Sequence, residues 1–159
     1  MYKLYKREAD RIRYHEAWDE DDCVIEHFGV VGKPGETRRH EVESGADPDT
    51  LLESLLRPVA RQGYEEVEDD ELVRVEVVLP TTGQGDLDRR HALEDQLDDL
   101  LGETGLGHCD GGRMDDSEMA AFCFVIDPGT ARAVIAEDLE NSTFSDFRLP
   151  QMELSPDPR

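Results

Sequence analysis

Apolar and polar residues alternate in three short stretches at the start of the chain. These stretches are YKLYKR (2–7), RIRYHEAW (11–18) and CVIEHFGVV (23–31). A period of two is typical of a β-strand with one buried face, and the polar breaks between the stretches have the length of hairpin connections. A fourth stretch, TRRHEV (37–42), follows the turn GKPGE, in which Pro34 fixes its own φ and Gly32 and Gly35 supply permissive backbone. The pattern predicts a meander of four antiparallel strands.

A helical spacing follows in the segment SGADPDTLLESLLRPVARQGY. Apolar residues recur there at intervals of three and four and form one stripe, made of Leu51, Leu52, Leu55, Leu56 and Val59. We expect Asp49 or Thr50 to cap the helix, Gly63 to end it, and Pro58 to kink or interrupt it. This helix is the natural cover for the apolar face of the sheet, because a sheet cannot leave that face bare.

The second half of the chain alternates strand-like and helix-like stretches. After VEDDE, the apolar run 72–79 predicts a strand, and LDRRHALEDQLDDLLGETG (87–105) predicts an amphipathic helix that Gly102 can end. A short strand at 107–110, a strand in EMAAFCFVID, a helix after Asp127-Pro128 and an extended segment in FSDFRLPQMEL complete the pattern, with SPDPR as a frayed tail. The order strand, helix, strand, strand, helix, strand is that of a ferredoxin-like βαββαβ plait, in which Pro150 is tolerable on an edge strand. The sequence therefore predicts an α+β protein with a first domain at 1–67 and a second at 72–154.

The first domain resembles a WGR domain, over about residues 2–67. That family carries Trp-Gly-Arg, then an apolar residue, a glycine and a short turn ending in Gly-Gln; this chain has Phe28-Gly29-Val30-Val31-Gly32, with Gly35-Glu36 after the turn. The resemblance implies an antiparallel sheet with one covering helix. In poly(ADP-ribose) polymerases the Trp and Arg of the motif help to hold a broken DNA end. Here Phe28 could still stack on a base, but Val30 cannot bond a phosphate.

Negative charge dominates the composition. The chain has 17 Lys and Arg against 39 Asp and Glu, a formal net charge of -22. Such a field repels phosphate backbones and anionic lipid at long range and favours cationic partners. Arg38 and Arg39 do not form a basic patch that could offset this repulsion, since adjacent strand residues point to opposite faces.

The segment GLGHCDGGRMDD contains the densest group of candidate metal-binding or reactive side chains. His108, Cys109 and Asp110 are ligand-capable residues in a row among glycines, which predicts either a metal or thiol site or a glycine-bulged strand. Alternation favours the strand, because it points His108 and Asp110 to one side and Cys109 to the other. Cys109 could then face Cys123 across a strand pair. We predict no metal, no cofactor and no catalytic residue.

These patterns leave three functions open. The preferred one is a non-enzymatic acidic protein of the immunity or regulatory type, which binds a protein partner, expected to be basic. Trp18, the only tryptophan, is a candidate anchor for that partner. The alternatives are nucleic-acid binding through Phe28 and Gly29, and a metal or thiol site at residues 108–110. The three cysteines form no CxxC pair, and no apolar run is long enough to span a membrane. We therefore expect a cytoplasmic protein that does not enter a membrane.

Overall fold

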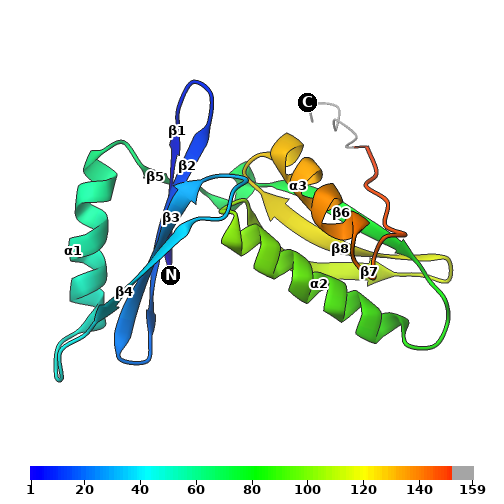
Figure 1. Ribbon diagram of the computed structural model, residues 1–159, viewed down its shortest axis with the longest axis horizontal. Coiled ribbons are helices and arrows are strands. Elements are labelled where there is room, and N and C mark those ends of the chain that lie inside the picture. The colour runs from blue at the N-terminus through cyan, green and yellow to red at the C-terminus, as the bar shows by residue number, and fades with distance from the viewer. Residues whose placement is uncertain (152–159) are drawn as a thin grey trace. The chain divides into compact units, whose positions relative to one another are not determined.

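The computed structural model of the protein describes residues 1–151, and it has the predicted α+β architecture (Figure 1). The chain forms two units. The first comprises Met1–Glu71 together with Glu103–Leu106, and the second comprises Leu72–Gly102 and the described residues from Gly107 onward. The break after residue 71 lies in the acidic segment between the two predicted domains. The return of four residues to the first unit is not visible in the sequence pattern.

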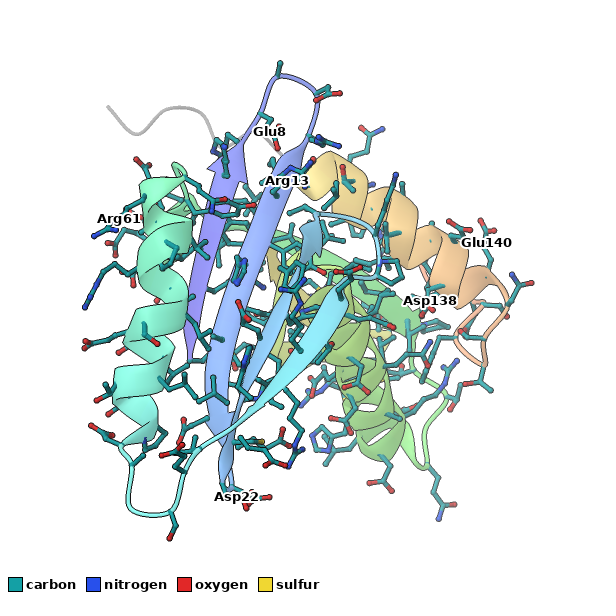
Figure 2. The ribbon with its side chains drawn as sticks, turned by 60° about the vertical axis from the view of Figure 1, so that its left-hand side comes forward. Glu8, Arg13, Asp22, Arg61, Asp138 and Glu140 are labelled. Carbon is teal, nitrogen blue, oxygen red and sulfur yellow. The ribbon has the colours of Figure 1, made fainter. Side chains whose placement is uncertain are left out.

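The first unit is built on an antiparallel sheet with strand order β4-β3-β2-β1-β5. Its strands are β1 (Tyr2–Arg7), β2 (Ile12–Glu20), β3 (Cys23–Val30), β4 (Glu36–Glu41) and the two-residue β5 (Glu65–Glu66). Figure 2 shows Glu8 and Arg13 side by side at the β1–β2 hairpin, where they form an ion pair. The alternating stretches thus form the predicted meander, and β5 adds a short fifth strand beside β1.

Helix α1 (Pro48–Arg61) packs on one face of this sheet (Figure 2). Leu52, Leu56 and Val59 form a core with residues of β1, β2 and β3, namely Leu4, Ala17 and Val24. The predicted cap was placed too late: Asp47 is the cap and accepts a hydrogen bond from the Asp49 amide at 3.1 Å, because Pro48 fits the first helical position. The prediction of an interruption at Pro58 was also wrong.

Pro58 lies on the exposed side of α1, and the helix continues through it to Arg61. Water can satisfy the carbonyl that the missing proline N–H leaves free on that side. Gly63 follows the last turn with a φ of 96°, as expected of a residue that ends a helix.

The second unit pairs a three-stranded antiparallel sheet with two helices. Its elements are β6 (Val73–Pro80), α2 (Asp86–Glu103), β7 (Gly107–Met114), β8 (Glu118–Val125) and α3 (Pro128–Glu140), and the strand order is β6-β8-β7. Both helices lie on the same face of the sheet (Figure 1). They bury Leu93, Leu97 and Leu101 of α2 and Ala131, Ile135 and Leu139 of α3. A short 3₁₀ turn, η1 (Asp69–Glu71), precedes β6.

Three boundaries in this unit differ from the sequence prediction. Helix α2 continues past Gly102 to Glu103, and β7 extends to Met114 instead of ending at Asp110. The predicted last strand is reduced to one antiparallel bridge between Val78 and Arg148. Pro150 has no N–H to continue pairing, and the carbonyls of residues 149 and 150 accept hydrogen bonds from Arg132 of α3. The end of that segment and the predicted tail lie outside the described residues.

Candidate functional site

Phe28, the residue in place of the family's Trp, is half-buried on β3 between two cross-strand neighbours. The His15 ring stacks on it from β2, with centroids 5.1 Å apart and an angle of 14° between the planes. The Arg38 guanidinium lies 4.8 Å from the ring centroid on the side of β4. A base could stack on Phe28 only by displacing one of these groups. Gly29 faces the other side of the sheet.

Trp18 does not join Phe28. It pairs with Ile25, whereas Phe28 pairs with His15, and the strand period of two places the two aromatic side chains on opposite faces. Trp18 is half-buried at the end of β2 and is close in register to Arg39 through Ile25. Arg38 and Arg39 also point to opposite faces, as expected. The first unit therefore does not assemble its two candidate aromatic anchors into one site.

Three residues on the Phe28 face form a cluster that the sequence reading missed. The Glu26 carboxylate accepts hydrogen bonds from His15 Nε2 at 2.6 Å and from His40 Nε2 at 2.7 Å. Burial acts to raise the pKa of Glu26, but the bonds from His40 and His15 outweigh it, so the pKa is below its ordinary value. The residues come from three adjacent strands, so their meeting depends on strand register.

The opposite face holds a second polar network, which is buried. His27 Nδ1 lies 2.7 Å from Glu16 Oε1, and the Tyr14 hydroxyl lies 3.3 Å from His27 Nε2. Tyr14 also donates to the Glu103 carbonyl at 3.2 Å. Burial, together with Glu16 and Glu103, raises the pKa of Tyr14 to about 12. Because Tyr14 is 0% and His27 7% exposed, this Tyr–His–Glu relay has no free substrate face and serves as a structural network.

The glycines of the FGVVGKPGE hairpin fit around that network. A Cβ at Gly35 would lie 2.1 Å from the Tyr14 hydroxyl oxygen and 2.6 Å from the Phe28 carbonyl oxygen. Gly32 has a φ of 95°, so it meets the backbone need that the sequence predicts. Gly35 does not have a positive φ, and it is needed because no side chain fits there. The glycine spacing that suggested a family thus has a local packing cause.

Residues 108–110 lie on β7 and do not converge. His108 and Asp110 are exposed, and His108 stacks on Phe124 with centroids 5.5 Å apart. Cys109 pairs directly with Cys123 of β8, and a β-bulge follows before Gly112. Within residues 1–151, no group of three or more His, Cys, Asp or Glu side chains is arranged to hold a metal ion. The functional side chain that lies opposite Cys109 is the thiol of Cys123.

A groove opens on the first unit between α1 and the β1/β5 edge of the sheet. Its cavity volume is about 380 Å³, and it is lined by Tyr2, Leu4, Glu53, Leu56, Arg57, Ala60 and Glu66. Tyr2 remains 43% exposed. The floor is apolar, whereas the rim carries two carboxylates and one guanidinium. Sequence reasoning did not find this site, because β5 is too short to show a strand pattern.

Two further findings concern membrane-spanning helices and similarity to known proteins. Among residues 1–151, no helix combines the length and the apolar character needed to cross a membrane. Comparison with family models, with curated proteins and with solved structures finds no match for this chain.

Proposed function

We propose that the protein is a non-enzymatic binding protein that recognises a basic segment of a protein partner through the groove between α1 and the β1/β5 edge. The groove joins an apolar floor, made of the buried Leu4 and Leu56, to the exposed carboxylates of Glu53 and Glu66. This arrangement suits an Arg or Lys side chain, whose aliphatic stem lies along apolar surface while its cationic head stays at the polar rim. The combination of apolar floor and acidic rim is the observation that carries the proposal.

The acidic run beside the groove supports a cationic partner. Residues 65–71, EEVEDDE, are exposed at every acidic position, and none of these carboxylates forms an ion pair within the described part of the chain. By contrast, Glu53 has a cationic neighbour, Arg57, at 4.0 Å across an exposed helix turn, where an ion pair contributes little. A basic segment would find unpaired carboxylates here, and the net charge of -22 would speed its approach.

An inhibitory or regulatory role is the class that this chemistry favours. An acidic protein that covers a basic surface competes with polyanions for it, which is how the immunity type of binding protein would act on a basic nuclease. This part of the proposal rests on charge complementarity and analogy.

Nucleic-acid binding, the function that the WGR resemblance would imply, has less support. The Phe28 ring already has a neighbour on each side, and Val30 offers no bond to phosphate. The excess of carboxylates also opposes approach to a polyanion. Tight binding of duplex ends that weakens steeply with salt would favour this function over ours.

A matched pair of variants tests the groove. The immobilised full chain is used to capture partners from extract of the source cells, and the purified partner is then titrated calorimetrically into three proteins. The first is the wild type, the second is Glu53→Gln/Glu66→Gln, and the third is Glu137→Gln/Glu140→Gln, which removes the same charge from exposed positions of α3.

We expect the groove variant to lose about tenfold or more in affinity, and the α3 variant to lose little, because only the former removes direct contacts. Equal losses in the two variants would mean that net charge alone attracts the partner, and would overturn the proposal that the groove is the binding site. Retention of nucleic acid in place of protein would overturn the proposed function.

A further inference from the structure

Two cysteines of the second unit lie directly opposite each other on neighbouring strands. Cys109 of β7 and Cys123 of β8 are register partners in an antiparallel pair, so both side chains are on the same face of the sheet. Both are free thiols. The neighbouring Cys109 thiol, burial and the nearby charge of Asp98 raise the pKa of Cys123.

The backbone shows which type of pair this is. The Cys109 N–H donates to Asp98 Oδ1 of α2 at 2.9 Å, so it does not donate to the Cys123 carbonyl. Cys109 and Cys123 therefore occupy a non-hydrogen-bonded position, where facing Cα atoms are about 4.5 Å apart and side chains approach most closely. A disulfide requires Cα atoms about 4.4–6.8 Å apart. The typical separation in a pair of this type falls within that range.

Access to solvent differs between the two thiols. Cys123 is 0% exposed, whereas Cys109 is only partly buried on β7, which forms one edge of the sheet. A β-bulge lies between Cys109 and Gly112, so the strand ladder is already interrupted beside this thiol. Cys109 is thus placed to meet a small oxidant, and Cys123 is placed to react with the oxidised product.

We propose that Cys109 and Cys123 are a site of reversible oxidative modification, at which a peroxide converts the two thiols into an intrachain disulfide. The Cys109 sulfur attacks one oxygen of hydrogen peroxide and becomes a sulfenic acid, and the other oxygen leaves as water. The Cys123 sulfur then attacks the Cys109 sulfur, and the sulfenic oxygen leaves as a second water with the Cys123 proton. Two thiols and one peroxide give one disulfide and two waters.

The modification would tie the edge strand β7 to β8 just before the bulge and the exposed residue Asp110. It does not depend on the groove of the first unit, so failure of one proposal leaves the other standing. Cys23, a buried thiol of the first unit that donates to the Glu20 carbonyl at 3.0 Å, is the internal reference.

Intact mass spectrometry of the full chain after treatment with stoichiometric hydrogen peroxide tests the proposal. We expect a loss of about 2 Da, a fall from three free thiols to one, and a linked peptide pair containing Cys109 and Cys123. A reducing agent should restore the mass. The unfolding midpoint of the oxidised protein should exceed that of the reduced protein.

Three variants locate the bond. Cys23→Ser should still lose about 2 Da, whereas Cys109→Ser should not. Cys123→Ala should instead retain a sulfenic acid at Cys109, which dimedone traps. Far-UV circular dichroism checks that each variant is folded, and Cys109→Ser alone suffices if the buried Cys123→Ala does not fold. Oxygen addition without loss of hydrogen in the wild type, only interchain dimers, or a bond that includes Cys23 would overturn the proposal.

Discussion

The hairpin glycine Gly35 provides the sharpest test of the packing in the first unit. In Gly35→Ala the added Cβ would lie 2.1 Å from the Tyr14 hydroxyl oxygen, 2.6 Å from the Phe28 carbonyl oxygen and 2.8 Å from His27 Nε2. Two of these three atoms belong to the buried Tyr–His–Glu network, and the third is strand backbone. The methyl group has no direction in which it can be accommodated without moving the network or the strand.

The expected loss is the balance of three contributions. Overpacking a core by one methyl group costs about 1–3 kcal/mol. Displacing the buried Tyr14 hydroxyl from the Glu103 carbonyl leaves a buried donor without its acceptor, which costs about 1–3 kcal/mol more. The smaller entropy of an unfolded chain with Ala in place of Gly returns about 0.4–1 kcal/mol. We therefore expect Gly35→Ala to lower the free energy of unfolding of the first unit by about 3 kcal/mol.

Urea denaturation followed by tryptophan fluorescence is the assay, because the single Trp18 lies in the first unit and reports on it alone. Gly102→Ala, in the second unit, is the control: a Cβ there meets no atom within 4 Å, so the fluorescence midpoint of the first unit should not change. Tyr14→Phe removes the nearest clashing atom, so it should cost less in the Gly35→Ala background than in the wild type. An unchanged fluorescence midpoint in Gly35→Ala would refute this account of the hairpin.

Three other predictions concern pH and redox state. The pKa of Glu26 is lowered in the fold, so the stability that its carboxylate contributes is complete above the ordinary value near 4.5 and is lost as the pH falls through the folded value. Glu26→Gln should therefore destabilise the first unit by about 2 kcal/mol at pH 7. Urea titrations should show this difference shrinking towards pH 3. The pKa of Tyr14 is raised from 10.0 to about 12, so the stability that its neutral hydroxyl contributes is complete below pH 10 and is lost as the pH rises towards 12. Thermal melts should show the wild type losing stability across that window more steeply than Tyr14→Phe. An equal dependence of stability on pH in the two proteins would contradict this. The Cys109–Cys123 disulfide closes a loop of roughly 15 residues, so oxidation should stabilise the second unit by about 3 kcal/mol, measured by circular dichroism with and without reductant.

Much of the secondary structure was predictable because it depends on short-range patterns. The alternation in YKLYKR and the stripe of leucines after Pro48 are local records of which side chains face a core. Asp127-Pro128 likewise begins α3 as expected, with Asp127 Oδ1 accepting from the Thr130 amide at 3.1 Å. The errors occurred where a local rule met a wider context, as at Pro58, whose exposed position removes the penalty that the rule assumes.

The candidate sites were less predictable, because each depends on register between strands that are distant in sequence. Cys109 and Cys123 could be suggested as neighbours because a single hairpin joins them. Glu26 could not be matched to both His15 and His40, since a shift of one residue in either pairing would send the histidines to the other face. The groove beside Tyr2 was hidden for a similar reason, as its edge is completed by only two residues of β5.

The sequence by itself determined the α+β class, most element positions and the excess of 22 negative charges, because these follow from residue identity and near-neighbour spacing. Only the tertiary structure decided that Phe28 lies between His15 and Arg38, that Cys109 is the register partner of Cys123, and that residues 103–106 belong to the first unit. Periodicity states which face a side chain takes. It does not state which side chain stands opposite, because that is set by the free energy of packing whole strands and helices together.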